Sequence, residues 1–555
     1  MRKYLIVGGV AGGATAAARL RRLDEKAEII LVERGGDISF ANCGLPYYVG
    51  GTIEERDNLL VMNPLGFNKL FNVDVRIFSE VVSVDPLKKT VQIRKGAEQY
   101  EERYDVLLLS PGAKPVRPRI PGIEHNKIVT LRNVPDADLL HKLGREYPKG
   151  KAVVVGGGFV GIESAENIKK LGLDVTVVEA APHILAPFDT DMVKLLENEL
   201  TNNGVNLILG DGVKEFHHEF DGSIKVELSS GKILSADFVV LSIGVQPDTA
   251  FLKESGIALN DWGYIIVNEY MQTNYQDIYA VGDAVQTFNS LTGENATLAL
   301  AGPANRQGRL AADNMVGSSK KYRGVVGSSI LKVFDLTGAA TGMNERILQQ
   351  RGWKYGRDYR FTITFPADHA SYYPGAKPIT LKVLFSLEDG KVLGAQAIGA
   401  KGVDKRLDVI ASVIRFDGTI HDLIDLELAY APPFSSAKDP VNMAGYYGEN
   451  ILQGLTDPLL PIELPEELDK GAVLIDVRSP GMFKEGHIKG AINIPAPKLR
   501  SELEKLDKNR PIIVSCRVGI NGYYMERMMK QQGFNARNLM GGFSYAKWFA
   551  LEFEE

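Results

Sequence analysis

A glycine-rich turn between an apolar strand and a helix occurs twice in this chain, at residues 8–13 and again at residues 156–161. The first turn reads GGVAGG and follows the apolar residues 4–7, and the second reads GGGFVG and follows residues 151–155. Glycines at such a turn let the backbone approach a pyrophosphate at the N-terminus of the helix. The repeat therefore predicts two Rossmann-like dinucleotide-binding domains, which are of the α/β class.

An acidic residue ends the strand that follows each turn. Glu33 comes after the apolar residues 29–32, and Glu179 comes after residues 174–178. A carboxylate at this place accepts hydrogen bonds from ribose hydroxyls and repels a 2′-phosphate, so Glu179 favours NADH over NADPH. Val10 stands where the second glycine of a GxGxxG pattern belongs, whereas the second turn keeps all three glycines.

The segment 273–283, TNYQDIYAVGD, predicts a polar turn, a short strand and then a glycine followed by Asp283. An aspartate at this place can reach the hydroxyls of a flavin's ribityl chain. The two dinucleotides that are most often used together are a flavin and a nicotinamide, so we expect FAD at the first turn and NADH at the second. The expected contacts to FAD are Gly8, Gly9, Ala11, Gly12, Gly13, Glu33, Arg34 and Asp283, and those to NADH are Gly156, Gly158, Gly161 and Glu179.

Composition narrows the class of protein. A chain of 555 residues should divide into three or four domains. Its net charge of −5 gives no reason to expect nucleic acid as a partner, and no apolar run is long enough to cross a membrane. The chain has no CxxC motif or His/Cys cluster, so we expect no metal. We expect a cytoplasmic enzyme, because two unpaired thiols suit a reducing compartment.

The only two cysteines each lie in a distinctive sequence. Cys43 is in SFANCGLP, soon after the first dinucleotide turn, and Cys516 is in VSCRVGING, near the other end. Isolated cysteines are commonly inert core residues. Here the surrounding sequences predict two sulfur-handling sites in one enzyme.

The segments up to about residue 447 resemble the flavoprotein disulfide reductases. Members such as glutathione reductase carry a CxxxxC pair beside the flavin, but here Tyr48 stands at the second cysteine position. The resemblance therefore implies that Cys43 cycles alone, through a sulfenic acid or a mixed disulfide. The stretch SFANCGLPYYVGG at residues 39–51 resembles coenzyme A disulfide reductase and its persulfide-reducing relatives.

This resemblance implies that Cys43 is the nucleophile facing the flavin. It also implies coenzyme A contacts at Thr15, Arg19, Arg22, Ser39, Asn42, Asn305 and Lys438. Without the resemblance, the two arginines read equally well as a solvated basic helix face. The sequences SYYPG and AYAPP resemble the segments whose tyrosines, here Tyr372 and Tyr430, reach the active site of the neighbouring subunit. A homodimer with a shared active site is therefore expected.

The C-terminal region resembles a single rhodanese, or sulfurtransferase, domain. The resemblance rests on VLIDVR at 473–478, GHIKGAINIP at 486–495 and the strand that delivers Cys516 to a glycine-containing loop. Backbone N–H groups in such a loop stabilise a thiolate that accepts sulfane sulfur as a persulfide. Relatives that use thiosulfate often have arginine where this chain has Asn521, so persulfide or polysulfide donors are favoured.

The expected architecture is therefore α/β, with an α+β dimerisation domain and an α/β rhodanese domain after the two dinucleotide-binding domains. The boundaries we expect are 1–112 with 246–324 for FAD, 113–245 for NADH, 325–447 for dimerisation, 448–462 for a linker and 463–555 for rhodanese.

The function we expect is NADH-dependent reduction of coenzyme A persulfide, polysulfide or related sulfane sulfur by Cys43, with Cys516 as sulfur acceptor. Coenzyme A disulfide reductase is the first alternative, because attack on either kind of S–S bond needs the same nucleophile. NADH peroxidase or oxidase is a second, although such peroxidases place a histidine where this chain has Val10. A third is that the rhodanese module carries sulfur to a partner protein.

Overall fold

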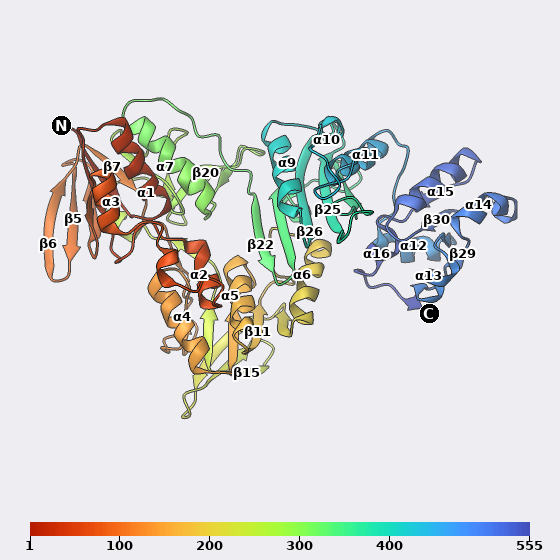
Figure 1. Cartoon of the computed structure of the whole chain (residues 1–555), viewed down its shortest axis with the longest axis horizontal. Coiled ribbons are helices and arrows are strands. Elements are labelled where there is room, and N and C mark those ends of the chain that lie inside the picture. The colour runs from red at the N-terminus through yellow and green to blue at the C-terminus, as the bar shows by residue number, and fades with distance from the viewer. The chain divides into compact units, whose positions relative to one another are not determined.

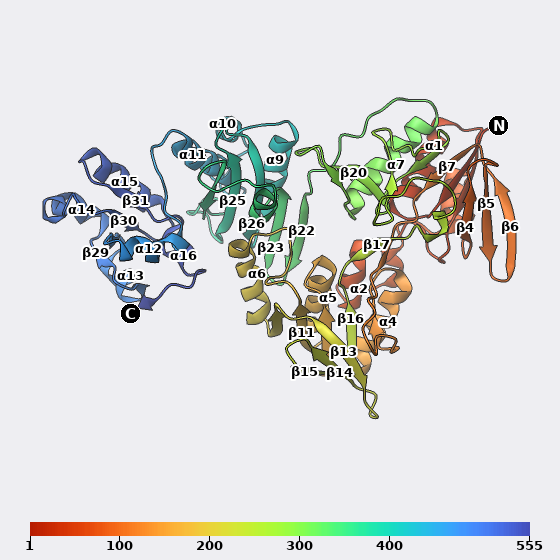
Figure 2. The same cartoon turned by 180° about the vertical axis from the view of Figure 1, so that it is seen from behind.

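The computed structural model describes all residues from 1 to 555, which divide into two units. One unit contains residues 1–185 and 200–327, and the other contains residues 186–199 and 328–555. Figures 1 and 2 show the chain from opposite sides, with the colour running from the N-terminus to the C-terminus. Each unit is described by itself.

A parallel five-stranded sheet carries the first glycine-rich turn. Its strand order is β19 (Ile278–Ala280), β7 (Val106–Leu109), β1 (Lys3–Val7), β2 (Glu28–Val32) and β3 (Asp74–Arg76). Apolar side chains fill these strands because both faces of a parallel sheet are covered. The helices α1 (Ala11–Leu23) and α7 (Ala301–Met315) lie side by side next to it (Figure 1). They approach closely, since a Cβ on Gly308 would lie 2.3 Å from the carbonyl oxygen of Gly12.

A second parallel sheet carries the second turn. Its order is β12 (Val205–Leu209), β11 (Asp174–Glu179), β10 (Lys151–Val155), β16 (Phe238–Leu241) and β9 (Ile128–Val129). The helix α5 (Phe159–Lys170) follows β10, and α4 (Val134–Glu146) precedes it. The chain passes between the two parallel sheets through an antiparallel pair, β8 (Ala113–Pro115) with β17 (Val245–Pro247).

Three smaller sheets and two short helices complete this unit. The sheets are β4 (Glu80–Asp85) with β5 (Thr90–Lys95) and β6 (Glu98–Arg103); β13 (Val213–His218) with β14 (Ile224–Leu228) and β15 (Ile233–Ala236); and β18 (Ile265–Ile266) with β20 (Val285–Phe288) and β21 (Asn295–Ala296). The helices are α2 (Leu45–Val49) and α3 (Pro64–Phe71). Figure 2 shows β4, β5 and β6 as a projecting antiparallel ribbon.

The second unit begins with an antiparallel five-stranded sheet. Its order is β22 (Ser329–Val333), β23 (Leu336–Gly342), β26 (Val392–Gly399), β25 (Ile379–Ser386) and β24 (Tyr359–Thr364). Its helices are α6 (Thr190–Asn202, of which residues up to 199 belong to this unit), α8 (Glu345–Gln350), α9 (Val403–Arg415), α10 (Ile420–Asp425) and α11 (Pro440–Leu452). Every residue of β25 and β26 is buried, so this sheet is covered on both faces.

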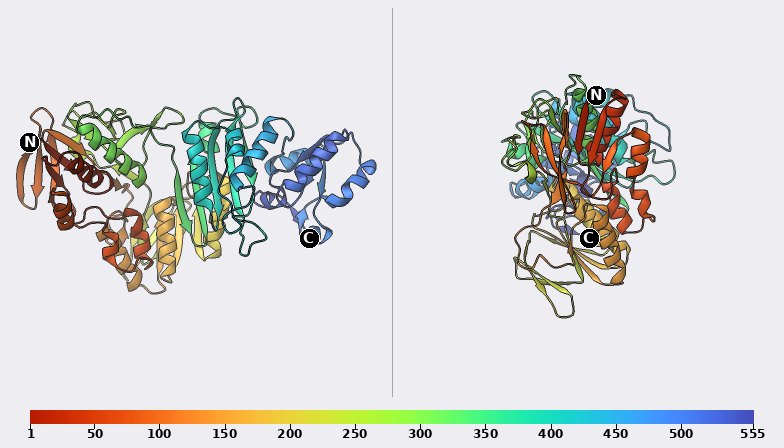
Figure 3. Two further views of the ribbon diagram at one scale, coloured as in Figure 1. Left: turned by 45° about the horizontal axis from the view of Figure 1, so that its top comes forward. Right: turned by 90° about the vertical axis from the view of Figure 1, so that its left-hand side faces the viewer.

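A C-terminal α/β module completes the second unit. Its parallel sheet has the order β29 (Ile492–Asn493), β27 (Val473–Asp476), β30 (Ile512–Ser515) and β31 (Ala536–Asn538). The accompanying elements are α12 (Leu464–Asp469), α13 (Pro480–Lys484), α14 (Ala496–Glu502), α15 (Ile520–Gln531), α16 (Gly542–Ala546) and the pair β28 (His487–Ile488) with β32 (Phe553–Glu554). In Figures 1 and 3 this module, in blue, lies next to the antiparallel sheet, in cyan.

A buried lysine joins distant parts of the second unit. The Nζ of Lys382 on β25, which is fully buried, lies 3.0 Å from Asp189, 2.9 Å from Asp191 and 2.6 Å from Glu345. The hydroxyl of Tyr545 in the C-terminal module donates a hydrogen bond to Asp191. Removing one partner from such a buried ion pair typically costs about 3–5 kcal/mol, because the remaining charge is left uncompensated. This Lys382 cluster therefore joins the start of α6, the antiparallel sheet and the C-terminal module.

Candidate functional site

The first glycine-rich turn has the geometry that the sequence predicts. Gly8 has a φ of +93°, and its Cβ would lie 2.1 Å from the carbonyl oxygen of Ser110, so only glycine fits there. A Cβ on Gly13 would lie 1.8 Å from the carbonyl oxygen of Gly8. No side chain caps the N-terminus of α1, which begins at Ala11, so its first N–H groups are free to meet an anion.

The carboxylate of Glu33 lies against this turn. It accepts hydrogen bonds from the backbone N–H of Gly9 at 2.9 Å and of Gly35 at 2.8 Å. A ribose hydroxyl could use the remaining lone pairs of the same carboxylate. Arg34 forms an ion pair with Asp248 at 2.5 Å, so part of its charge is already matched within the protein.

Asp283 follows β19 and is largely enclosed. It pairs with Arg132 at 3.1 Å, and the backbone N–H of the preceding Gly282 donates to Gln307. Burial raises the pKa of Asp283, and the positive charge of Arg132 acts in the opposite direction. Arg132, which the sequence did not single out, therefore belongs to this site as the counterion of Asp283.

The second turn repeats this geometry with the complete glycine pattern. A Cβ on Gly161 would lie 2.0 Å from the carbonyl oxygen of Gly156, whereas a Cβ on Gly158 would meet no atom within 4 Å. Gly158 thus borders open space, as the middle glycine must if a pyrophosphate is to approach the backbone. Glu179 accepts from the N–H of Gly157 at 2.6 Å and of Ala181 at 2.7 Å. Both turns therefore fit a dinucleotide.

Cys43 lies in a 3₁₀ turn, Asn42–Gly44, that leads directly into α2, and its side chain is solvent-accessible. Desolvation by the surrounding protein raises the pKa of Cys43, and the charges of Glu163 and Asp283 raise it further. Arg132 acts against this increase. The thiolate of Cys43 is therefore opposed by two carboxyl groups and supported by one guanidinium.

Glu163 is a second group that the sequence did not single out. It lies on α5, and the hydroxyl of Tyr47 on α2 donates to its Oε1 at 3.2 Å. Burial raises the pKa of Glu163 to about 7, with a further increase from Glu166. A carboxyl group that titrates near neutrality beside Cys43 can hold or release a proton during thiol chemistry.

Tyr48 occupies the place of the missing second cysteine and has a packing role. Its ring stacks on His141 of α4, with centroids 4.9 Å apart, and its hydroxyl donates to Asp138 at 3.2 Å. The segment around Cys43 is therefore fixed to α4 and α5 by side chains rather than by a disulfide.

The residues predicted to contact coenzyme A in this unit fall into two groups. Thr15 donates to Asn305 at 2.5 Å and Arg19 pairs with Asp313 at 2.7 Å, so polar side-chain contacts join α1 to α7. Arg22 is exposed further along α1. Ser39 and Asn42 lie beside Cys43, where Ser39 has a φ of +48° and Asn42 has a buried Oδ1 without a hydrogen-bond partner. An unpaired buried acceptor next to the thiol is consistent with a ligand there.

Three further residues predicted from the sequence lie in the second unit and are described there. Tyr372 and Tyr430 come from separate loops, and their hydroxyls lie 2.7 Å apart. Their side chains are 73% and 45% exposed. The hydrogen bond with Tyr372 raises the pKa of Tyr430. Lys438 directly precedes Asp439, the N-cap residue of α11. The structure therefore brings the two tyrosines together as one exposed pair.

Cys516 lies at the end of β30 and is only 3% exposed. Its Sγ accepts a hydrogen bond from the N–H of Gly519 at 3.1 Å, and Gly519, with a φ of +93°, is the N-cap of α15. The side-chain amide of Asn538 donates to the carbonyl oxygen of Gly519 at 3.1 Å. Asn521 is exposed on the first turn of α15. The loop thus gives the sulfur one backbone donor, the N–H of Gly519, at a helix N-terminus.

His487 has a packing role in the same module. Its ring stacks on Phe483 with centroids 3.7 Å apart, and its Nδ1 lies 3.1 Å from the carbonyl oxygen of Phe483.

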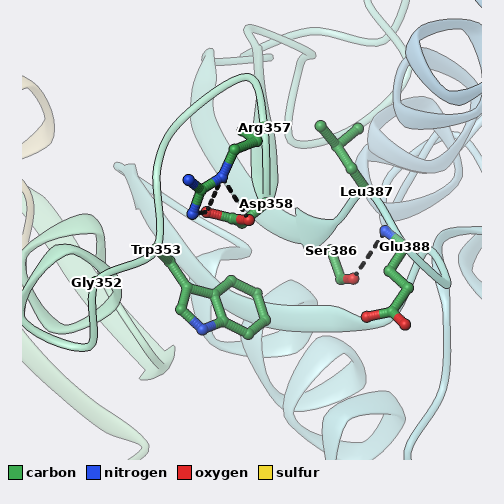
Figure 4. A pocket seen from close by; sticks show the side chains of 7 residues that line it. All are labelled: Gly352, Trp353, Arg357, Asp358, Ser386, Leu387 and Glu388. Atoms are coloured by element: carbon green, nitrogen blue, oxygen red, sulfur yellow. Dashed lines mark hydrogen bonds and ion pairs between the residues drawn. The ribbon is translucent and has the colours of Figure 1, made fainter.

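Elsewhere in the second unit, a shallow hollow contains none of the predicted site residues (Figure 4). Its residues are Gly352, Trp353, Arg357, Asp358, Ser386, Leu387 and Glu388. No helix in the structure has both the length and the apolar character needed to span a membrane.

Comparisons with protein families match three segments of the chain. The model described as pyridine nucleotide-disulphide oxidoreductase matches residues 2–308, and the model of that family's dimerisation domain matches residues 328–440. The model described as rhodanese-like domain matches residues 460–548. Together these matches confirm the predicted fold class.

Among curated relatives, the coenzyme A disulfide reductase of Staphylococcus epidermidis is 36% identical over 451 residues, which are 80% of this chain and 99% of that protein. Among solved structures, reduced CoADR-RHD of Bacillus anthracis is 46% identical with a TM-score of 0.95, covering 99% of this chain and 98% of that one. A NAD-dependent persulfide reductase from A. fulgidus is 36% identical with a TM-score of 0.92, covering 99% and 100%. The resemblance that the motifs predict is therefore confirmed.

Proposed function

The chain belongs to the pyridine nucleotide-disulphide oxidoreductase family, on the branch of the coenzyme A disulfide reductases, and from this we propose its substrate. We propose that the enzyme uses NADH to reduce the sulfane sulfur of coenzyme A persulfide, or of a polysulfide, to thiol and sulfide through Cys43. Cys516 of the rhodanese module is the proposed acceptor and carrier of sulfane sulfur.

The observation that carries this proposal is the presence of two different sulfur sites in one chain. Cys43 has no partner cysteine, and Cys516 lies in a loop where the backbone N–H of Gly519 donates to its sulfur, which suits a persulfide. A coenzyme A disulfide reductase needs only the first site, so the rhodanese module is best explained by a substrate that contains sulfane sulfur. The persulfide reductase of A. fulgidus and CoADR-RHD of B. anthracis each match 99% of this chain, the rhodanese region included, so the rhodanese module accompanies the reductase in both.

The cofactors are FAD and NADH. The first turn, with Glu33 and Asp283, fits FAD, and the second, with Glu179, fits NADH, because each carboxylate keeps lone pairs for sugar hydroxyls. FAD, when bound, takes up two electrons from NADH and makes them available to the sulfur chemistry at Cys43. The fixed charge of Glu179 repels a 2′-phosphate and thereby supports the preference for NADH.

Cys43 begins the chemistry as a thiolate that attacks one sulfur of the substrate's S–S bond. Attack on the inner sulfur forms a mixed disulfide between Cys43 and coenzyme A and releases hydrosulfide. Attack on the outer sulfur forms a persulfide on Cys43 and releases the coenzyme A thiol. In either case, two electrons and the protons that accompany them then cleave the S–S bond formed on Cys43. This cleavage releases the second product and restores the thiolate. Glu163, which accepts a hydrogen bond from Tyr47, has a pKa of about 7 and can hold one of these protons.

Several proposed contacts complete the site. We assign substrate contacts to Thr15, Arg19, Arg22, Ser39, Asn42, Asn305 and Lys438. The exposed hydroxyl pair of Tyr372 and Tyr430 supports a role at the Cys43 site of the other subunit of a homodimer, consistent with the match to the dimerisation domain.

The proposed domain division follows the sheets of the fold. The FAD-binding domain consists of residues 1–112 and 246–324, and the NADH-binding domain consists of residues 113–245. Dimerisation uses residues 325–447, a linker covers 448–462 and the rhodanese domain covers 463–555. Two cysteines that are both free support the cytoplasm as the place of action, because free thiols persist in a reducing compartment.

The test is anaerobic NADH consumption by the purified protein, with coenzyme A persulfide compared with coenzyme A disulfide while sulfide is measured. Faster turnover of the persulfide, with sulfide released, is the expected result. Faster turnover of the disulfide would instead assign the enzyme as a coenzyme A disulfide reductase, the activity named for the S. epidermidis relative.

Reduction of oxygen is the other activity that a similar structure supports. The water-forming NADH oxidase of Lactobacillus brevis is 26% identical with a TM-score of 0.78, covering 82% of this chain. Oxygen consumption in the absence of any sulfur substrate would favour that activity. Val10 argues against peroxide chemistry, because it cannot transfer a proton to a peroxide.

A further inference from the structure

One arginine of the second unit is buried completely and bonds to the loops that carry Tyr372 and Tyr430. Arg406 lies on α9 and is only 1% exposed. A guanidinium stays charged inside a protein, so it is stable there only where its N–H groups are bonded to polar partners. The partners of Arg406 therefore show which segments of the chain this helix holds together.

The first group of partners fixes the loop that carries Tyr372. Arg406 donates to the carbonyl oxygen of Asp368 at 2.9 Å and to that of Gly402 at 3.2 Å. Asp368 and Lys377 close the base of the loop, because the N–H of Asp368 donates to the carbonyl oxygen of Lys377 at 2.8 Å and the N–H of Lys377 donates to the Asp368 carboxylate at 2.9 Å. Arg406 thus holds the base of the Tyr372 loop.

The second group of partners fixes the segment between Tyr430 and α11. Arg406 donates to the Oγ of Ser435 at 3.1 Å and pairs with the carboxylate of Asp439 at 3.0 Å. The Oγ of Ser435 in turn donates to Asp439 at 2.6 Å, and all three side chains are buried. Asp439 is the N-cap residue of α11, so Arg406 joins the end of this segment to α9.

The two loops meet beside this buried group and again at their tips. The N–H of Ala370 donates to the carbonyl oxygen of Ser435 at 2.9 Å, and the hydroxyls of Tyr372 and Tyr430 lie 2.7 Å apart. A hydrogen bond between exposed hydroxyls adds little stability by itself, because water competes for both groups. The pairing of the two tyrosines therefore depends on the buried contacts at the base of their loops.

We propose that Arg406 is a positioning residue for the reaction at Cys43, which keeps the hydroxyls of Tyr372 and Tyr430 together by bonding to both loops at once. The inference rests on the proposed function, in which this tyrosine pair acts at the Cys43 site of the other subunit. A planar guanidinium suits the task, because its fork bonds to a carboxylate, a hydroxyl and a carbonyl oxygen at the same time. A lysine has one nitrogen and reaches fewer of these partners.

The first measurement observes the tyrosine pair directly. In the full-length, FAD-containing protein, 3-fluorotyrosine replaces Tyr430 and its titration is followed by 19F NMR. The hydrogen bond with Tyr372 raises the pKa of Tyr430, so we expect Arg406→Met to shift the titration to lower pH about as far as Tyr372→Phe does. Removal of a positive charge would by itself raise this pKa, so a shift to lower pH reports the lost hydrogen bond.

Ile410→Ala is the control for lost stability. Ile410 lies on the same helix and is also fully buried, but it belongs to neither loop. This variant should lower the melting temperature and leave the titration where it is. An unshifted titration in Arg406→Met would overturn the proposal, as would an equal shift in Ile410→Ala. Should Arg406→Met not fold, Arg406→Lys decides, because it keeps the charge opposite Asp439 without the fork, and a titration like that of the parent would then overturn the proposal.

Steady-state kinetics separate this inference from the proposed function. With NADH and the faster of the two coenzyme A substrates, Arg406→Met should lower kcat about 5- to 10-fold and change KM less, with little further loss when Tyr372→Phe and Tyr430→Phe are already present. A fully additive loss would overturn the inference, because Arg406 would then act apart from the tyrosines. Thiocyanate formation from inorganic polysulfide and cyanide, which needs only Cys516, should not change. If the double tyrosine variant keeps the parent rate, the role of the tyrosines in the proposed function fails, while the NMR titration still decides whether Arg406 positions them.

Discussion

Cys43 is solvent-accessible, and desolvation together with the charges of Glu163 and Asp283 raises its pKa, whereas Cys516 is buried and its sulfur accepts a hydrogen bond from the Gly519 backbone. Both must be thiolates to attack an S–S bond. Around Cys516 the support comes from backbone dipoles that do not titrate. Around Cys43 the permanent charge of Arg132 supports the thiolate, whereas the charge of Glu163, whose pKa is about 7, opposes it and is lost when Glu163 is protonated. The difference indicates that Cys43 is the thiol whose reactivity responds to protonation nearby.

The largest expected effect comes from Cys43→Ser. Because a serine hydroxyl is a far weaker nucleophile and leaving group, NADH-dependent reduction of persulfide and disulfide should fall at least about 1,000-fold. Flavin binding and transfer of sulfane sulfur to cyanide should be retained, which the flavin spectrum and thiocyanate formation measure. Retained reduction would show that Cys43 is not the nucleophile.

Cys516→Ser should impair the reactions of sulfane sulfur, NADH-dependent persulfide reduction included, and leave disulfide reduction intact. Sulfur transfer to cyanide should fall on the order of 100-fold or more, since its nucleophile is lost. Reduction of coenzyme A disulfide should stay within about twofold of the parent rate, because it needs only Cys43. Steady-state rates of both reactions in one preparation measure this. If NADH-dependent persulfide reduction is also unchanged, the rhodanese module instead carries sulfur to a partner protein.

Glu179→Ala should affect only the reaction at Cys43, because that reaction uses the nicotinamide cofactor and sulfur transfer at Cys516 does not. Removing the carboxylate that accepts from Gly157 and Ala181 should raise kcat/KM for NADPH relative to NADH by about 10-fold, because repulsion of the 2′-phosphate is lost. Only the chemistry at Cys43 uses the nicotinamide, so thiocyanate formation should not change. An unaltered cofactor ratio would remove Glu179 as the selectivity residue.

The smallest expected effect comes from Glu163→Gln. The charge of Glu163 raises the pKa of Cys43, so an uncharged side chain should lower that pKa and speed alkylation of Cys43 about threefold at pH 8. Glu163 has a pKa of about 7, so well below neutrality it is already protonated and the variant should match the parent. Iodoacetamide reactivity between pH 5 and 9 measures this. Glu163→Asp keeps the charge and serves as the control, and equal reactivity of all three proteins would exclude the electrostatic coupling.

The sequence was sufficient to predict the architecture, because the signals for it are local. Each dinucleotide turn lies within six consecutive residues, and the loop around Cys516 is equally short. Such segments carry their backbone requirements with them: Gly8 and Gly156 both have a positive φ that strongly favours glycine.

The interactions of the charged groups that act on Cys43 could not be predicted, because they join residues far apart in the sequence. Tyr47 meets Glu163 across 116 positions, and Arg132 meets Asp283 across 151. Neither residue of the first pair belongs to a motif that indicates such a contact. Arg19 and Arg34 were expected as ligand contacts, and their ion pairs with Asp313 and Asp248 likewise depend on the folded arrangement of distant segments.

The Lys382 cluster bears on how a two-module enzyme of this kind can change over evolution. Asp191 pairs with Lys382 and also accepts a hydrogen bond from Tyr545. The rhodanese module therefore contributes a hydroxyl to a buried ion-pair cluster of the dimerisation region. A rhodanese sequence brought in from another protein would need a donor at that place, or a compensating change at Asp191. The module is therefore not freely interchangeable, and we expect Tyr545 and Asp191 to be kept or replaced together among fused relatives.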